Sequence, residues 1–346
     1  MSRAADSDDG AMAHPRETSA LFGHAEAEQA LLEAYRSSRI PHAWLLGGES
    51  GIGKATLAYR MARFVLAHPD PAMPAVQNAT SLAVPADHPV ARRIAGQAHP
   101  DLLVLQRVIN EKTGKLYPVI RVDDVRRSVP FFGSTAGEGG WRIAIVDSVE
   151  ELNKESENAL LKVLEEPPPR TLLLLVSHAP GRVIPTIRSR CRALLLRPLS
   201  AEDVARAAAT ALGEAADTPQ IRAAAEAADG SVGRALMLLE GDALALRQQV
   251  IDMLDRLPQL DPRALHALGD ALAGTEAETL SAFLDTVNSW LATRLRSGPQ
   301  ESRRLARVGD VWESVNRAAR EVETYNLDRK PFVFSVFNLL AEAARA

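Results

Sequence analysis

The sequence has 346 residues, of which 46% are hydrophobic and 24% charged, and its formal net charge is −4. This composition indicates a globular protein of two or three domains, and the negative charge excludes a chain that binds nucleic acid through overall positive charge. The single cysteine, Cys191, excludes a disulfide framework and a zinc site built from several cysteines, and it agrees with a reducing cytosol.

The N-terminal residues lack the basic and apolar pattern of a secretory signal, and no apolar run reaches the roughly 20 residues of a membrane helix, so we expect a cytoplasmic protein. Residues 1–18 are small, acidic and polar, and are expected to be disordered. Apolar spacing predicts a helix over 25–38, a buried strand over 42–48 and a long helix over 53–67. Residues 69–98, rich in proline and alanine, are expected to form an insertion.

Apolar runs predict further strands. We place them at 101–108, 117–122, 141–149, 171–177 and 192–199. A predicted helix over 153–166 ends at three prolines. Because buried apolar strands alternate with helices, we predict a parallel α/β sheet covered on both faces over residues 19–197. After Pro198 the strands disappear, and we predict two helical regions, 198–243 and 244–346.

The segment GGESGIGKATLA, residues 47–58, has the spacing of a phosphate-binding loop between a strand and a helix. The loop residues expected to bind nucleotide are Gly48, Gly51, Gly53, Lys54, Ala55 and Thr56. The glycines allow backbone N–H groups to converge on phosphates, and Lys54 would reach the β and γ phosphates. Ala55 stands where a hydroxyl normally coordinates Mg²⁺, and Thr56 is rotated by about 100° around the helix, so it does not substitute.

The strand RIAIVD ends in Asp147, the expected second half of a nucleotide site. The following position, which normally holds a glutamate base, holds Ser148. Glu150 and Glu151 lie further along and are expected to face elsewhere if the strand ends at Asp147. With Ala55 this makes two missing hydrolytic groups, so we do not expect effective ATP hydrolysis by this chain. Two alternatives stay open: weak ATP binding, which makes ATP the one candidate cofactor, or a loop kept only for its shape.

Three segments, ENALLKVLEEPPPRTLLLLVS, PTIRSRC and GSVGRAL, resemble in that order the clamp-loader subunits of bacterial DNA polymerase III, members of the AAA+ P-loop ATPase family. The resemblance covers roughly residues 20–240. It implies an AAA+ α/β domain with a parallel sheet, a small helical lid domain over 198–243, and a C-terminal helical bundle over 244–346. That bundle would be a collar, the domain through which such subunits oligomerise.

The resemblance also implies a role for Ser189-Arg190-Cys191, which looks like the family's Ser-Arg-Cys motif. Arg190 would be an arginine finger that acts in trans, on ATP held by a neighbouring subunit. Taken without the resemblance, the segment RSRCR is a short basic cluster on a solvated face.

Two sensor positions follow from the same resemblance. Ser177, at the end of a buried strand, would be the sensor-1 residue, with the neighbouring His178 as the alternative. Arg234 would be the sensor-2 arginine that folds the lid over the nucleotide, and its simpler interpretation is an arginine on a helix surface.

The resemblance implies a stator in a hetero-pentamer with delta and gamma or tau subunits, which loads the beta sliding clamp on primed DNA during replication. The chain would serve a DNA-directed DNA polymerase without being a polymerase itself. The main alternative is a catalytically active motor subunit of the gamma or tau type. A nucleotide kinase and a plain DNA-binding adaptor with Arg92-Arg93 and Arg126-Arg127 are weaker alternatives. Many relatives carry a four-cysteine zinc module where this chain has residues 69–98. Because this segment contains no cysteine, we expect no zinc.

Overall fold

The computed structural model of the chain describes residues 14–110, 114, 116–133, 140–273, 277–297, 302–325 and 327–345. They belong to two compact units, Met1–Leu236 and Met237–Ala346. The boundary lies earlier in the chain than the predicted one between 243 and 244. Residues 1–13 of the tail expected to be disordered lie outside the described residues.

The first unit is built on a five-stranded sheet with the strand order β2-β3-β4-β1-β5. The strands are β1 (Ala43–Gly47), β2 (Leu102–Gln106), β3 (Arg142–Asp147), β4 (Thr171–Ser177) and β5 (Arg192–Leu195). All neighbouring pairs are parallel, which confirms the predicted sheet type. The central strands β1 and β4 are buried along their whole length because helices cover both faces.

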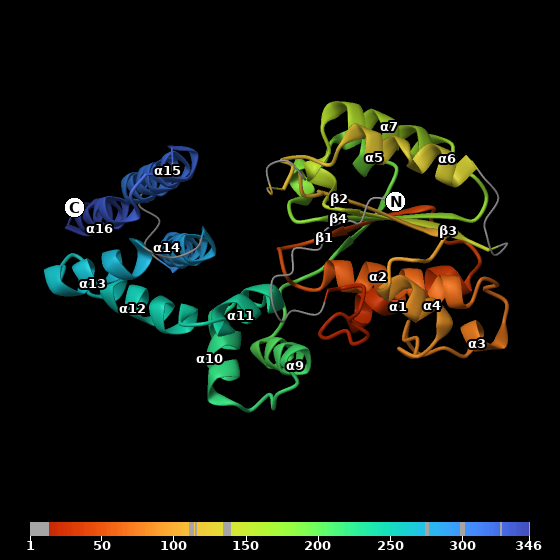
Figure 1. Cartoon of the computed structure of the whole chain (residues 1–346), viewed down its shortest axis with the longest axis horizontal. Coiled ribbons are helices and arrows are strands. Elements are labelled where there is room, and N and C mark those ends of the chain that lie inside the picture. Colours follow the sequence, from red (N-terminus) through yellow and green to blue (C-terminus); the bar gives the residue numbers. More distant parts are fainter. Residues whose placement is uncertain are drawn as a thin grey trace. The chain divides into compact units, whose positions relative to one another are not determined.

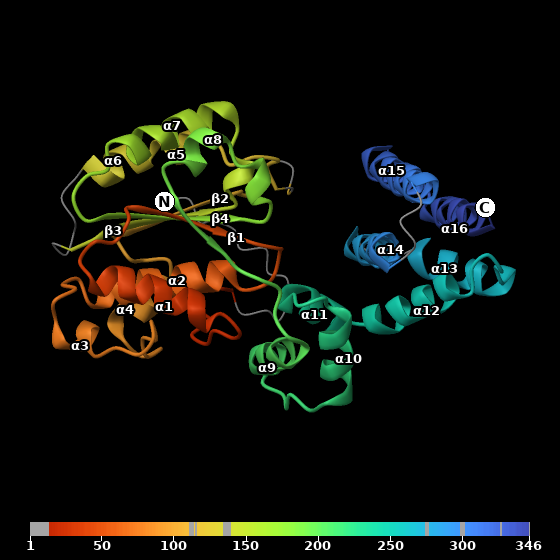
Figure 2. The same cartoon turned by 180° about the vertical axis from the view of Figure 1, so that it is seen from behind.

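Each face of the sheet has its own helical layer and its own apolar core (Figures 1 and 2). On one face lie α1 (Ala25–Arg36), α2 (Lys54–Ala67) and α4 (Pro89–Ala95). On the other lie α5 (Val122–Arg126), α6 (Ser128–Gly133) and α7 (Lys154–Glu165). Short helical turns complete this part: α3 (Pro74–Gln77), η1 (Val149–Glu151), η2 (Pro180–Arg182) and α8 (Pro185–Arg188). The predicted helices 25–38, 53–67 and 153–166 are thereby confirmed.

The proline-rich segment 69–98 is folded and contributes to the core. Val76, Leu82 and Ile94 are at most 1% exposed and belong to the cluster under α1 and α2. The backbone N–H of Leu82 donates to Oε1 of Glu28 at 3.1 Å, which ties the segment to α1. Although its composition is typical of a loose insertion, the segment contains several apolar residues that complete the core on one face of the α/β domain.

Residues 14–18 are not disordered, so that part of the prediction is wrong. Nη2 of Arg63 donates to the carbonyl oxygens of Pro15 at 3.1 Å and Thr18 at 2.6 Å. Arg16 is only 8% exposed. Polar composition suggested a solvated tail, but a buried arginine on α2 satisfies backbone carbonyls of this segment and holds it in place.

Two strand predictions need correction. The segment 117–122 forms one isolated bridge, between Ile120 and Leu152, and its last residue begins α5; Pro118 lacks the N–H that a strand ladder requires. The strand predicted over 192–199 is short, and it is mostly exposed rather than buried. It lies at the edge of the sheet and pairs only with β1, so apolar residues such as Leu195, 68% exposed, are left uncovered.

The region after Pro198 is helical throughout the described residues. The lid helices are α9 (Ala201–Leu212), α10 (Pro219–Ala227) and α11 (Val232–Leu239). The Ser200 side chain accepts a hydrogen bond from the N–H of Asp203 and is the N-cap of α9. Gly213 ends α9 with φ +70°, a conformation that glycine adopts without strain.

The second unit is a helical bundle with its own core. It contains α12 (Ala243–Asp255), α13 (Pro262–Ala273), α14 (Ala277–Ser297), α15 (Ser302–Tyr325) and α16 (Arg329–Arg345). The aromatic rings of Phe283, Phe332 and Phe337 meet in its centre, with ring centroids 6.3 Å apart in each pair that includes Phe283. Across the described helices of both units, none is long and apolar enough to cross a membrane.

Candidate nucleotide-binding site

The strand register brings the predicted site residues to one edge of the sheet. Gly47 at the end of β1 is opposite Ser177 at the end of β4. Asp147 at the end of β3 is opposite Val176 and, on its other side, Gln106. In open parallel sheets, ligands bind outside these carboxyl ends. The phosphate loop, Asp147 and the end of β4 are thus assembled as the sequence predicts.

The phosphate loop has the close-packed backbone that its glycines allow. Gly48 donates its N–H to the carbonyl of Ser177 at 3.2 Å, and Gly53 is the N-cap of α2. Gly51 has φ +72°, and its carbonyl accepts a hydrogen bond from the N–H of Gly233 in the lid at 3.1 Å. A Cβ on Gly51 would lie 2.3 Å from Oγ of Ser231. The lid therefore packs directly on the loop.

The change Gly51→Ala is expected to destabilise the first unit. The positive φ costs an alanine roughly 1–2 kcal/mol, and the new methyl group must also push away Ser231. The free energy of unfolding, measured by urea denaturation, should fall by at least about 1 kcal/mol, and the urea midpoint should fall with it. Gly181→Ala is the matched control, since nothing lies within 4 Å of its added Cβ, and it should change stability by less than about 0.5 kcal/mol. Equal midpoints for the two variants would contradict the packing described.

Lys54 is buried at the start of α2, only 2% exposed, and its Nζ donates to the carbonyl oxygen of Glu49 in its own loop. Burial lowers the pKa of Lys54 to about 8, although the carboxylates of Asp147, Glu150 and Glu49 oppose the shift. Burial raises the pKa of Asp147 to about 6, although Lys54 opposes this shift. Near neutral pH the lysine is therefore still charged, and Asp147 is mostly ionised.

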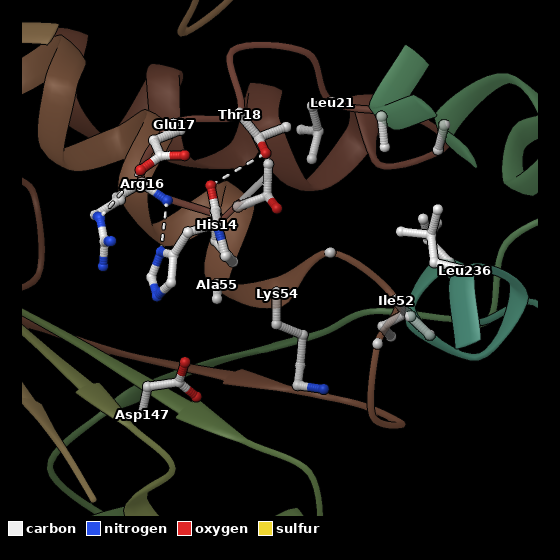
Figure 3. Close-up of a pocket in the computed structure, with 18 of the residues that line it drawn as sticks. His14, Arg16, Glu17, Thr18, Leu21, Ile52, Lys54, Ala55, Asp147 and Leu236 are labelled. Carbon is white, nitrogen blue, oxygen red and sulfur yellow. Dashed lines mark hydrogen bonds and ion pairs between the residues drawn. The ribbon is translucent and has the colours of Figure 1, made fainter. Parts of the chain in front are cut away.

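A cavity of about 1050 Å³ opens beside the loop (Figure 3). Its described lining includes residues 14–22 of the N-terminal segment, loop residues Gly51, Gly53, Lys54, Ala55 and Thr56, and the strand-end residues Asp147 and His178. Figure 3 shows Asp147 on the sheet and Lys54 extending from the start of α2 toward it, with His14 and Thr18 on the opposite side of the cavity from Asp147. Of the residues predicted to bind nucleotide, Gly48, Ser177 and Arg234 are not part of the described lining.

The two sensor-1 candidates have different environments. Ser177 is fully buried, and its Oγ accepts a hydrogen bond from the N–H of Ala179 at 3.2 Å. His178 lines the cavity. Oε1 of Glu150 accepts from the N–H groups of His178 at 2.6 Å and Ala179 at 3.1 Å. Glu150 is not part of the described lining of the cavity, and its carboxylate holds the turn that follows β4.

Arg234 is not brought into the site. Its Nη1 forms an ion pair with Oδ2 of Asp229 at 2.8 Å, and its backbone N–H donates to Oγ of Ser231. The lid instead reaches the loop through the backbone of Gly233. The sensor-2 interpretation of Arg234 is not supported by this arrangement.

The Ser-Arg-Cys motif lies outside the cavity, just before β5. Arg190 is half-buried; its Nη2 pairs with Oε1 of Glu165 at 2.8 Å, and its Nη1 donates to the carbonyl of Thr186 at 2.9 Å. Oγ of Ser189 donates to the same carbonyl at 3.2 Å. The Cys191 side chain packs against the core, and burial raises the pKa of its thiol to about 12. The cysteine therefore anchors the motif and is not a nucleophile at neutral pH.

Several residues of the site were missed from the sequence. The N-terminal segment lines the cavity although its composition is that of a solvated tail. Arg107 also lines the cavity, and its Nε pairs with Oε2 of Glu151 at 2.8 Å. No local pattern marks either. The position of Glu150 depends on the turn after β3, where η1 follows the strand at once, and a strand-length estimate does not give that turn.

A parallel sheet in this strand order, a phosphate loop and a helical lid define an AAA+ P-loop protein. Residues 23–200 match the family model described as DNA polymerase III, delta subunit. This is more than half of the chain, and the chain belongs to that family.

Curated proteins that are similar in sequence are also subunits of DNA polymerase III. The DNA polymerase III subunit delta' of Pseudomonas aeruginosa is 41% identical over 150 residues, which are 43% of this chain and 41% of that protein. The delta' subunit of Escherichia coli K12 is 28% identical over 81% of this chain and 76% of its own length. The tau subunit of Escherichia coli K12 is 28% identical over 78% of this chain and 40% of its length. The predicted resemblance to clamp-loader subunits of DNA polymerase III is confirmed.

Solved structures that resemble the chain are more distant. A DNA polymerase III gamma subunit-related protein from Thermotoga maritima is 16% identical, with a TM-score of 0.41, over 91% of this chain and 99% of that one. The RuvB Holliday junction branch migration motor from the same organism is 16% identical, with a TM-score of 0.44, over 93% of this chain and 91% of that one.

Proposed function

We propose that the chain acts as a stator of the DNA polymerase III clamp loader, in the role of delta prime. The observation that carries the proposal is an ordered, accessible Arg190 in a chain whose own phosphate loop lacks hydrolytic groups. Arg190 would reach ATP bound by a neighbouring subunit and stabilise the charge that develops on the transferred phosphoryl group. The chemistry that the chain assists then takes place in its neighbour, in a cytoplasmic complex.

The residues of the site do not complete a Mg²⁺ site of the usual kind. The side chain of Ala55 offers no oxygen to a metal ion. The group that would activate water is also missing, because Ser148, 4% exposed, stands where a glutamate base is expected. Glu150, the nearest replacement, already binds two backbone N–H groups. Lys54 still suits a phosphate group, and the cavity still suits a nucleobase. We therefore propose that the chain binds ATP weakly and does not hydrolyse it effectively. No zinc role is proposed.

The proposed partners are delta and gamma or tau subunits in a hetero-pentamer, with the beta sliding clamp and primed DNA engaged through the complex. The similarity to both delta' and tau subunits supports membership in this set of proteins. The test is co-purification under native conditions. Recovery of delta, gamma or tau together with the chain supports the proposal. A chain that elutes alone when those subunits are present in excess contradicts it.

The competing proposal is an active motor subunit, which the intact Lys54 and Asp147 favour. The two proposals differ in the ATPase activity of the isolated chain. We expect no turnover above background, because the metal-binding hydroxyl and the base are both missing, and we expect Ala55→Thr to leave it at background since Ser148 is unchanged. Turnover that Lys54→Ala abolishes would identify a motor and contradict the stator.

A further inference from the structure

The guanidinium of Arg190 is held by two elements that are distant in sequence. Glu165 is the last residue of α7, and its Oε1 lies 2.8 Å from Nη2. The carbonyl of Thr186 in α8 lies 2.9 Å from Nη1. The C-terminal end of a helix also carries partial negative charge, which favours a cation beside it. The C-terminal end of α7 therefore favours the positive charge of Arg190 and binds its guanidinium through Glu165.

We propose that Glu165 is a positioning residue for Arg190, an inference that rests on the finger role proposed above. A guanidinium has five N–H groups in one plane. The contacts described use one on Nη1 and one on Nη2, so Nε–H and one hydrogen on each terminal nitrogen are left for a phosphate. Glu165 orders the side chain before the neighbouring nucleotide arrives, which reduces the rotamer entropy lost in the transition state.

The strength of the pair suits this task. The Arg190 side chain is 35% exposed and the Glu165 side chain 50% exposed, so solvent screens the ion pair. Such a pair orders the arginine without holding it against the much larger charge of a triphosphate. A fully buried pair would instead retain it.

Nearby charged residues are not held in this way. Arg188 is exposed with no described hydrogen bond from its side chain, and Arg192 lies with its guanidinium 5.1 Å from the ring centroid of Trp44. Glu166, adjacent to Glu165, is exposed and has no described side-chain partner. Among these residues, only Arg190 is clamped between α7 and α8.

The test uses the full chain reconstituted with its clamp-loader partners, with ATP and primed DNA as probes. We expect Glu165→Ala to slow DNA-stimulated ATP hydrolysis at the adjoining motor site up to about fivefold, the range of an exposed ion pair. KM for ATP should not change, because the neighbouring subunit binds the ATP. Glu165→Gln keeps an oxygen acceptor and should recover part of the loss. The control Glu166→Gln should behave as the unaltered chain.

The double variant Glu165→Ala/Arg190→Ala separates this inference from the proposed finger. If Glu165 acts through Arg190, the double variant is no slower than Arg190→Ala alone. A further loss in that background, an unchanged kcat in both Glu165 variants, or a faster one, would overturn the positioning role while Arg190→Ala still slows turnover. An Arg190→Ala loader with full activity would instead overturn the proposed finger itself.

Discussion

Replacing Phe337 by alanine will lower the free energy of unfolding of the second unit by about 3–5 kcal/mol. Phe337 is fully buried on α16, and its ring packs against that of Phe283 from α14. Removing the ring leaves a cavity among residues that close it only partly, so the loss combines transfer and cavity terms. Urea denaturation followed by far-UV circular dichroism measures the change.

Assembly depends on the same core if this unit is the collar. Phe337→Ala should therefore abolish co-elution with delta and gamma or tau subunits on size-exclusion chromatography. The matched control is Asn338→Ala, the next residue on α16, which is exposed and should keep both stability and assembly. A Phe337→Ala chain that assembles normally would mean that the second unit does not carry the oligomeric contacts.

Much of the fold could be predicted because the inner strands β1, β3 and β4 are buried on both faces. The runs RIAIVD and TLLLLVS are almost continuously apolar, as strands covered by two helical layers must be. The helix 153–166 was equally clear because prolines end it. Such signals are local, and they do not depend on what packs against them.

The errors occur where long-range contacts decide the structure. The strand β5 has an apolar sequence like the others, but its position at the sheet edge leaves it exposed, and position in the sheet is not written in the run itself. The segment 14–18 is polar, yet Arg63 binds its carbonyls from α2. In both cases the deciding contact is distant in sequence: β5 pairs with β1, and Arg63 binds residues 14–18.

The candidate site shows the same division. The loop and Asp147 converge because parallel strands place their carboxyl ends at one edge, which the spacing predicts. Arg234 has the right position in the lid but pairs with Asp229. Glu150 binds the turn after β4, a contact set by how η1 leaves the sheet. Side-chain direction at turns was beyond a prediction from residue spacing.

Replacing Arg190 by alanine will reduce ATP hydrolysis at the adjoining subunit's site by about 10³-fold or more. An arginine finger supplies positive charge and a planar donor set as negative charge shifts in the transferred phosphoryl group, and alanine supplies neither. The effect should appear in kcat because the finger acts in the transition state. Arg188→Ala is the control, since Arg188 is exposed two residues away and has the same charge.

The most direct measurement is single-turnover hydrolysis of ATP by loaders reconstituted with the unaltered chain, with Arg190→Ala or with Arg188→Ala, on primed DNA with the clamp present. We predict that Arg190→Ala removes the share of fast hydrolysis that belongs to one motor site, while Arg188→Ala retains all of it. Equal burst amplitudes and rates in the three loaders would contradict a stator that acts through Arg190.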